Sequence, residues 1–171
     1  FTTRELWLLA DLSPRGPERA HIVLTALEAH GPLADWQVLL AWNVAVDEAR
    51  ALRLEETALP IQLTLHERFQ AQWSAEDLAL TYRLLGREKA SSRILEEAIR
   101  QERDAGRRPA SLLEKRGIHA LGFGDEAGAR DYLGQALPEA SDDAGLVLAR
   151  LDLMAGKSEN ARCGFQALLL R

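Results

Sequence analysis

Apolar residues recur three and four positions apart along most of this chain, the spacing that places them on one face of an α-helix. The clearest stretch runs from Ala75 to Ala98, and Gly86 divides it in two. Small residues stand where two helix backbones must approach closely, and larger ones stand where a gap must be filled. The pattern predicts two short helices joined by a tight turn at Gly86; the small positions are Ala75, Ala79, Ser91 and Ala98, and the larger ones are Leu78, Tyr82 and Leu95.

The same pattern returns twice downstream. It is carried first by Leu113, Gly117, Ala120, Gly124, Ala129, Leu133 and Ala136, and then by Leu148, Ala149, Gly156, Ala161 and Phe165. Gly124 and Gly156 are 32 residues apart, as are Ala129 and Ala161, whereas Gly86 and Gly124 are 38 apart. We therefore expect an extra turn within 101–108. A helical pair repeated at a nearly constant period predicts an array in which neighbouring pairs share a core.

Prolines, glycines and caps set the expected helix boundaries. The segment from Leu33 to Leu59 is one long helix or two with a joint near Asp47, Pro60 opens the next helix, and Ser74 with Asp77 resembles a capping box. No stretch alternates apolar and polar residues long enough to predict a strand. The expected helices span 3–12, 18–30, 33–59, 60–72, a segment ending at 85, 89–104, 110–122, 125–137, 142–155 and 158–170.

These residues resemble the tetratricopeptide repeat (TPR) family, clearly over 73–171 and only in traces over 1–72. Leu78, Ala79 and Tyr82 match the first helix of its unit, while Arg116, Ala120 and Asp152 depart from the pattern in later units. The resemblance implies an all-α fold, a right-handed superhelical array of antiparallel helix pairs. It also implies one helical-repeat domain over 1–171, with units at 73–108, 109–140 and 141–171 and with degenerate repeats or a helical cap over 1–72.

The TPR resemblance further implies where a partner binds, because the first helix of each pair lines a concave groove in that family. One TPR subgroup grips peptide carboxylates there with Lys and Asn, but Glu76, Leu80 and Glu114 hold those positions here, so that mode is not expected. The groove positions are Trp73, Glu76, Asp77, Leu80, Arg83, Leu84, Ser111, Glu114, Lys115, Ile118, Leu146, Val147 and Arg150.

Charge adds a second candidate surface. The chain carries a formal net charge of −5, which argues against a general polyanion binder. Between Arg83 and Arg116, however, ten Lys/Arg stand against six Asp/Glu. This run, with Arg100, Arg103, Arg107 and Arg108 at its centre, is either a solvated helix end or a docking patch for an acidic protein surface or anionic polymer. Of the four tryptophans, Trp7, Trp36 and Trp42 are core candidates, and Trp73 is the candidate exposed anchor.

Candidate catalytic motifs are weak. The G-x-G-x-x-A match at Gly122–Ala127 follows a helical pattern rather than the strand that a dinucleotide site needs, which favours a helix–turn–helix connection. The histidines at 21, 30, 66 and 119 form no metal motif, Ser91 has no obvious base, and Cys163 reads as a buried thiol. We expect no catalytic residues, no metal and no cofactor.

The sequence therefore predicts a non-enzymatic protein-interaction scaffold that is a piece of a longer protein. Its partner is expected to be another protein rather than nucleic acid, and no segment is apolar enough to enter a membrane. Similarity to the repeat regions of bacterial exopolysaccharide-export proteins suggests a polysaccharide-modifying enzyme as partner and a periplasmic location. Two alternatives are a helical regulatory domain of a signalling or transcription protein and a helical enzyme with an interhelical site.

Overall fold

The computed structural model describes residues 1–29, 31–137 and 142–169, and all the regular structure within these ranges is helical. The chain divides into two compact units, Phe1–Arg87 and Glu88–Arg171, called unit 1 and unit 2 below. The expected all-α fold is confirmed. The expected boundary between the 109–140 and 141–171 repeats, His30 and the predicted helix end at 170 lie outside the described residues, and the division into repeats stays a prediction.

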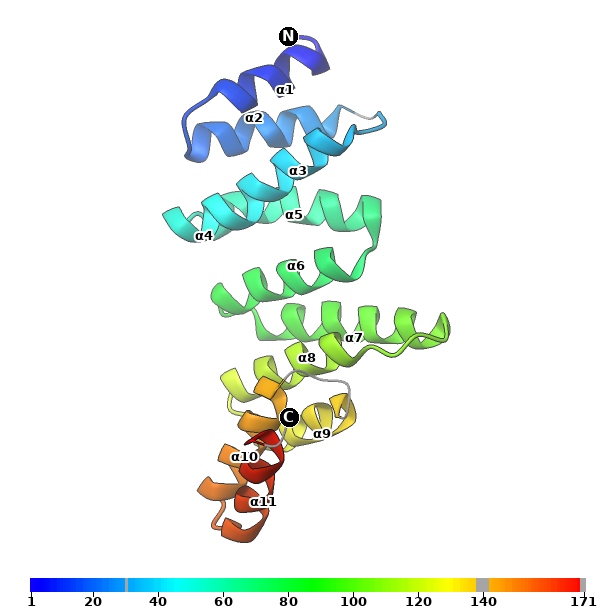
Figure 1. Cartoon of the computed structure of the whole chain (residues 1–171). Helices are drawn as coiled ribbons and strands as arrows, with labels where there is room; N and C mark the ends of the chain where they lie inside the picture. The colour runs from blue at the N-terminus through cyan, green and yellow to red at the C-terminus, as the bar shows by residue number, and fades with distance from the viewer. Residues whose placement is uncertain (30, 138–141, 170–171) are drawn as a thin grey trace. The chain divides into compact units, whose positions relative to one another are not determined.

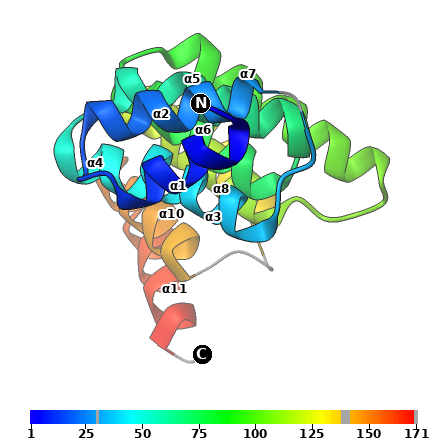
Figure 2. The same ribbon diagram turned by 90° about the horizontal axis from the view of Figure 1, so that it is seen from above.

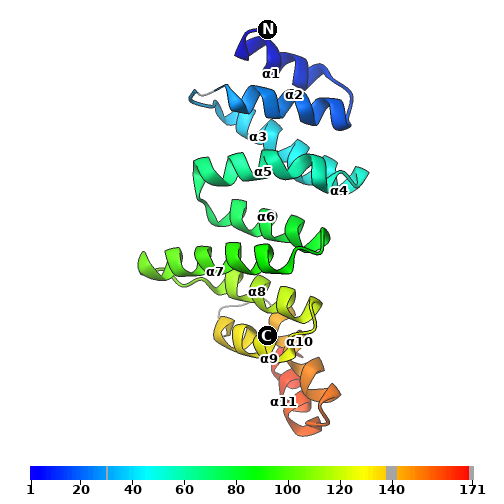
Figure 3. The same cartoon turned by 180° about the vertical axis from the view of Figure 1, so that it is seen from behind.

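Unit 1 begins with helices α1 (Thr3–Leu12) and α2 (Pro17–Glu28), followed by α3 (Asp35–Asn43) and α4 (Ala49–Leu52). It ends with α5 (Glu55–Phe69) and α6 (Gln72–Leu84). Helix α1 packs on α2 and α5 on α6, while α2 packs on α5 across the intervening α3–α4 segment (Figures 1 and 3). Trp7, Val23 and Ile61 are fully buried among these helices and form the centre of the core of unit 1.

The predicted segment 33–59 is not one helix. A stretch of π-helix, η1 (Val44–Glu48), lies near the expected joint at Asp47, and the chain breaks later, at Arg53, whose φ is 58°. The prediction that Pro60 opens a helix is wrong, because α5 begins five residues earlier and contains it. Proline lacks an N–H and costs one hydrogen bond of the helix ladder. Helix α5 is 15 residues long and buries Ile61 and Leu65, and this packing outweighs the lost bond.

The π-helix is held by a side chain from a neighbouring helix. In a π-helix the backbone bonds reach five residues, as from the N–H of Ala49 to the carbonyl of Val44, which disrupts the regular ladder. Gln62 of α5 donates its side-chain amide to the carbonyl of Ala45 at 2.7 Å, inside the core. This buried hydrogen bond ties α5 to the π-helical segment.

An ion pair lies in the same core. Arg19 of α2 donates to Glu48 of η1 at 2.7 Å, and the side chains of Arg19 and Glu48 are only 13% and 4% exposed. Arg15 approaches the same carboxylate oxygen at 3.9 Å from a much more exposed position. Burying two charges is favourable only when they are paired, so this contact fixes α2 against the irregular segment.

The expected capping box at the start of α6 is wrong. The helix begins at Gln72, so Ser74 lies inside its first turn and donates to the carbonyl of Ala71 at 2.7 Å. The Ser74 hydroxyl also lies 3.0 Å from Nδ1 of His66 on α5. Serine and threonine often bond back along the helix in this way, and a sequence pattern does not separate that from a cap.

Unit 2 contains α7 (Glu88–Asp104), α8 (Ala110–Gly122), α9 (Glu126–Ala136), α10 (Asp142–Met154) and α11 (Ser158–Leu169). Each helix packs on the next in chain order. The view from above shows the chain turning back at the far end of α7 through an extended connection to α8 (Figure 2). Helix α7 has 17 residues whereas α9 has 11, so the longer 38-residue spacing comes from the length of α7 and not from an extra turn in this connection.

Helices α7, α8 and α10 end in the same turn. At the end of α8, Gly124 has φ 85° and donates to the carbonyl of Leu121, and Asp125 donates to the carbonyl of Ala120. This pair of bonds is the Schellman motif, which needs a residue in the left-handed region and so favours glycine. Gly106 and Gly156 repeat it in unit 2, and Gly86 repeats it at the end of unit 1.

The small residues of the repeating pattern are buried, as predicted. Ala129 and Leu133 are fully buried, and Ala161 is 1% exposed. Gly117 marks the closest approach, because a Cβ built there would lie 2.6 Å from Cγ of Leu133 and 3.2 Å from the carbonyl oxygen of Ala129. Cys163, in contrast, is exposed on α11, so its expected burial is wrong. Among the described residues, no helix is both long and apolar enough to cross a bilayer.

Candidate partner-binding surfaces

An apolar groove, here called the aromatic groove, opens on unit 1 between α3 and the α5–α6 connection. It has a volume of about 660 Å³ and is lined by Asp35, Val38, Leu39, Trp42, Phe69 and Trp73. Leu39 is 65% exposed and Trp73 is 38% exposed, and the ring centroids of Phe69 and Trp73 lie 6.0 Å apart. Large apolar side chains that stay this accessible beside one another are typical of a protein-binding surface.

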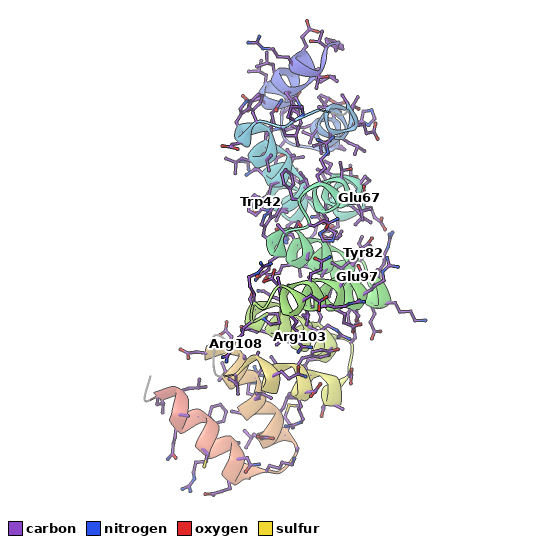
Figure 4. All side chains as sticks on the ribbon, turned by 90° about the vertical axis from the view of Figure 1, so that its right-hand side faces the viewer. Trp42, Glu67, Tyr82, Glu97, Arg103 and Arg108 are labelled. Atoms are coloured by element: carbon purple, nitrogen blue, oxygen red, sulfur yellow. The ribbon has the colours of Figure 1, made fainter. Side chains whose placement is uncertain are left out.

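Hydrogen bonds hold the floor of the aromatic groove in place. The indole N–H of Trp42 donates to Oδ2 of Asp77 at 2.9 Å, and Arg50 donates to Oδ1 of the same carboxylate at 2.8 Å. Asp77, which the sequence placed in a binding groove, therefore positions Trp42 (labelled in Figure 4). Because both carboxylate oxygens are engaged, the Trp42 ring is fixed before any partner arrives.

Trp36, also on α3, is 45% exposed, so its expected place in the core is wrong. Its ring meets the fully buried Trp7 edge-on, with the centroids 6.2 Å apart. Trp7 is in the core as predicted, and Trp73 is accessible as predicted. The apolar spacing along α3 did not separate the face that packs on α5 from the face that meets solvent.

The remaining predicted groove positions divide between the two units. Glu76, Leu80 and Arg83 are half-buried on α6 and lie outside the lining of the aromatic groove, while Leu84 is exposed near the end of that helix. In unit 2, Glu114 is half-buried and Lys115 is exposed on α8. Arg150 lines a smaller hollow of about 240 Å³ with Leu121, Val147 and Met154. A single groove shared by α6, α8 and α10 stays a prediction.

A second groove, here called the arginine groove, lies in unit 2 at the connection between α7 and α8. It has a volume of about 550 Å³, and Arg103, Arg107 and Arg108 line it together with the end of α9. Three of the four predicted basic-patch residues therefore meet at one site (Arg103 and Arg108 are labelled in Figure 4). Arg100 is exposed on α7 but is not among the lining residues.

Two of these arginines are held by neighbours. Arg107 donates twice to the carboxylate of Glu102, at 2.6 Å and 2.8 Å, which holds the pKa of that carboxyl below its usual value of 4.5. Arg103 of α7 donates to the side-chain oxygen of Gln135 on α9 at 2.7 Å. Since Gln135 is neutral, that contact orients the Arg103 guanidinium without cancelling its charge.

The sequence missed a buried serine–histidine contact. Ser91 Oγ on α7 lies 2.7 Å from Nδ1 of His119 on α8, so the expectation that Ser91 has no nearby base is wrong. Ser91 is fully buried and His119 is 3% exposed. A substrate has no access to either atom, and we interpret the contact as an interhelical hydrogen bond. The spacing of 28 residues gives no local signal, because only the packing of α7 on α8 brings the two together.

The glycine-rich match at 122–127 is a helix–turn–helix connection, as expected. Helix α8 runs directly into it, and Asp125 accepts a hydrogen bond from the backbone N–H of Gly128 at 2.9 Å, which caps α9. A dinucleotide site needs a preceding strand, and a helix stands there instead. Within the described part of the chain, no three His, Cys, Asp or Glu side chains gather in a way that could hold a metal ion.

Comparisons with known proteins identify the fold. The chain is similar to the structure of the MamA RS-1 ArsTM double mutant, with a TM-score of 0.66, 9% identity, and coverage of 98% of this chain and 92% of that one. It is also similar to a protein of Podosopora anserina described as a kinesin light chain with nearly identical TPR-like repeats, with a TM-score of 0.65, 13% identity, and coverage of 98% and 93%. MamA AMB-1 matches with a TM-score of 0.57 and 14% identity over 97% of this chain and 87% of that one.

These structural neighbours are TPR-like repeat proteins over nearly the whole chain, so the fold predicted from the sequence is confirmed. Identities this low establish the fold alone. No family profile matches the chain, and no curated protein matches it either. The chain thus has the fold of a TPR-like helical-repeat protein.

Proposed function

We propose that this chain is a protein-interaction scaffold that receives an apolar anchor of a partner protein in the aromatic groove. The observation that supports this most directly is the accessible, pre-ordered cluster of Leu39, Trp42, Phe69 and Trp73. Aromatic side chains bury a large area and lose little rotamer entropy when a partner covers them, so they dominate binding energies at protein interfaces.

The chemistry of the groove favours binding over catalysis. Among the described residues that line it, Asp35 is the only ionisable side chain, and one carboxylate alone provides no acid–base pair. Its position predicts a basic group on the partner next to the apolar anchor, because an opposite charge there lowers the cost of covering the carboxylate. A helical enzyme with an interhelical site remains an alternative without a supporting constellation in either groove.

Recruitment of a polysaccharide-modifying enzyme, a role in exopolysaccharide export and a periplasmic location depend on the sequence resemblance, and the comparisons lend them no support. A regulatory domain of a signalling or transcription protein uses the same apolar groove equally well. Identification of the partner would choose between these roles.

A paired selection tests the scaffold proposal. A display library of natural protein fragments is selected on the wild-type chain and, in parallel, on a Leu39→Ser/Trp73→Ser variant. Both positions are partly exposed, so the variant should remain folded, which far-UV circular dichroism checks. We expect fragments that bind the wild type and lose at least about tenfold in affinity for the variant, since removing a central aromatic anchor costs about 2 kcal/mol or more.

The matched control is Leu12→Ser, which removes an exposed leucine from α1 outside the groove. Fragments that depend on the aromatic groove should bind this variant as they bind the wild type. Selected fragments that bind the Leu39→Ser/Trp73→Ser variant with unchanged affinity, or a selection that enriches none, would contradict the proposal.

A further inference from the structure

We propose that the arginine groove of unit 2 binds a linear acidic peptide segment of a partner protein, with an apolar side chain at the centre of the acidic stretch. This site is separate from the aromatic groove, and its residues all belong to unit 2. Variants of one groove therefore leave the lining of the other unchanged, so binding at each groove can be tested independently.

Three guanidinium groups converge on the arginine groove. Arg103, Arg107 and Arg108 come from the last turn of α7 and the connection after it, and all three border the same hollow. Glu102 neutralises part of the charge of Arg107, whereas Arg103 contacts the neutral Gln135. An arginine presents five N–H donors in a planar fork, so Arg107 keeps donors beyond the two that Glu102 uses.

The arginine groove also has an apolar lining. Pro109, Leu113, Ala136 and Leu137 line it together with the arginines. Leu113 is almost completely buried and gives a rigid surface, while Leu137 is 37% exposed and remains available for contact. A purely charged ligand would leave this apolar surface exposed to water. A peptide with one Leu or Phe between acidic residues would bury it, which is favourable.

The same features favour a peptide over an anionic polymer. A polyanion binds a track of cations that follows its repeating charges, and its affinity depends on many such contacts. Here the lining arginines are confined to one hollow, and the chain as a whole carries a net charge of −5. The limited size and apolar lining fit a short segment, which gains orientation from the arginines and contact area from the exposed Leu137.

The test measures binding of fluorescein-labelled 12-residue peptides to the full 171-residue chain by fluorescence anisotropy. The central probe has five acidic residues on each side of a Leu–Phe pair. Its matched relatives replace the Leu–Phe pair with Ser–Ser, or all acidic residues with Lys. We expect the central probe to bind at least about tenfold more tightly than either relative, because it alone satisfies both the arginines and the apolar lining of the groove.

Three variants locate the binding. Arg103→Glu/Arg108→Glu should lower affinity for the central probe at least about tenfold, since like charges then face each other. Leu137→Ser should remove the advantage of the Leu–Phe pair over Ser–Ser. Arg93→Glu reverses an exposed charge of α7 outside the groove and should leave the affinity within about twofold of wild type once the net charge change is screened at physiological salt.

Several results would overturn the proposal. These are absent binding of the central probe, equal binding of the Ser–Ser relative, equal losses in Arg93→Glu and in the arginine-groove variant, or tighter binding of a sulfated or uronate polysaccharide than of any acidic peptide. The last result would assign the groove to an anionic polymer instead. None of these results would affect the aromatic groove, whose own selection uses different variants.

Discussion

The two units reach the same helix-on-helix packing by different local means. Unit 2 ends α7, α8 and α10 with a glycine in the left-handed region, and a glycine lets α8 and α9 approach closely. Unit 1 ends α4 and α5 with Arg53 and Gln70 in that region, contains a π-helix, and buries an arginine–carboxylate pair. Glycine turns allow the same helix-pair pattern to repeat along unit 2. In unit 1, the irregular turns and the π-helix are stabilised by contacts that occur at one place only, such as the buried ion pair.

The largest expected effect tests the buried pair of unit 1. Arg19→Met leaves the carboxylate of Glu48 in the core with only the solvent-exposed Arg15, 3.9 Å away, and we expect a loss of about 3 kcal/mol in the free energy of unfolding. All four tryptophans lie in unit 1, so urea denaturation followed by tryptophan fluorescence reports on this unit.

The double variant Arg19→Met/Glu48→Leu should recover most of that loss, because two apolar side chains leave no buried charge. As a surface reference, Arg162→Met removes an exposed pair with Glu159 and should change stability by no more than about 0.5 kcal/mol. If Arg19→Met cost no more than Arg162→Met, the buried pair would not explain how the irregular core is held.

The second prediction tests the close approach in unit 2. Gly117→Ala forces a Cβ against the buried Leu133 and the backbone of Ala129, so we expect destabilisation by about 2 kcal/mol. Gly134→Ala, on the open face of α9, has nothing within 4 Å of the new Cβ and should stabilise by up to about 1 kcal/mol. Far-UV circular dichroism during urea denaturation measures both, and two changes of the same sign would refute the packing argument.

The third prediction concerns the residues with positive φ at the helix ends: a glycine is introduced in unit 1 and one is removed in unit 2. Arg53→Gly should stabilise by about 0.5–1 kcal/mol, because an arginine at φ 58° pays a steric cost that glycine avoids. Gly124→Ala, at φ 85°, should destabilise by about 1 kcal/mol for the reverse reason. Thermal unfolding of the two single variants checks the signs. No gain from Arg53→Gly would mean that its side chain stabilises the turn in a way that glycine cannot replace.

The smallest effect concerns the surface pair of unit 2. The hydrogen bonds from Arg107 hold the pKa of Glu102 below its usual 4.5, so the pair stabilises the fold above that pH. The stabilisation should be lost as the pH falls through the pKa of the folded state. An NMR titration of the Glu102 carboxyl carbon should show the depressed pKa, and Arg107→Gln should raise it again. An unchanged pKa in that variant would remove the pairing as its cause.

The sequence predicted the helices of unit 2 closely because its signals are local. Gly124 and Gly156 mark turns through backbone sterics alone, and the alanines beside them mark close packing at a fixed period. In unit 1 the same reasoning placed a helix start at Pro60 and a cap at Ser74, and both were wrong. There the burial of α5 and bonds from distant side chains override the local preference of each residue.

The candidate sites likewise combine features that the local sequence predicts with features that only tertiary packing sets. Trp73 and the arginines at 103, 107 and 108 were singled out from residue type and spacing, and each borders a groove. The sequence did not reveal that Asp77 holds Trp42, that Ser91 meets His119, or that Trp36 is exposed while Cys163 is not buried. The two contacts join residues on separate helices, and the two exposures depend on how each helix is rotated against its neighbours; a single sequence carries no local signal of either.

What the sequence determined by itself is the helical class, most turns and the positions where helices pack closely, because each depends on a few neighbouring residues. Only the tertiary structure decided which tryptophans form a groove and which guanidinium groups share a hollow with an apolar lining. Those outcomes depend on the angle and register at which one helix packs on another, and many side chains set that geometry together.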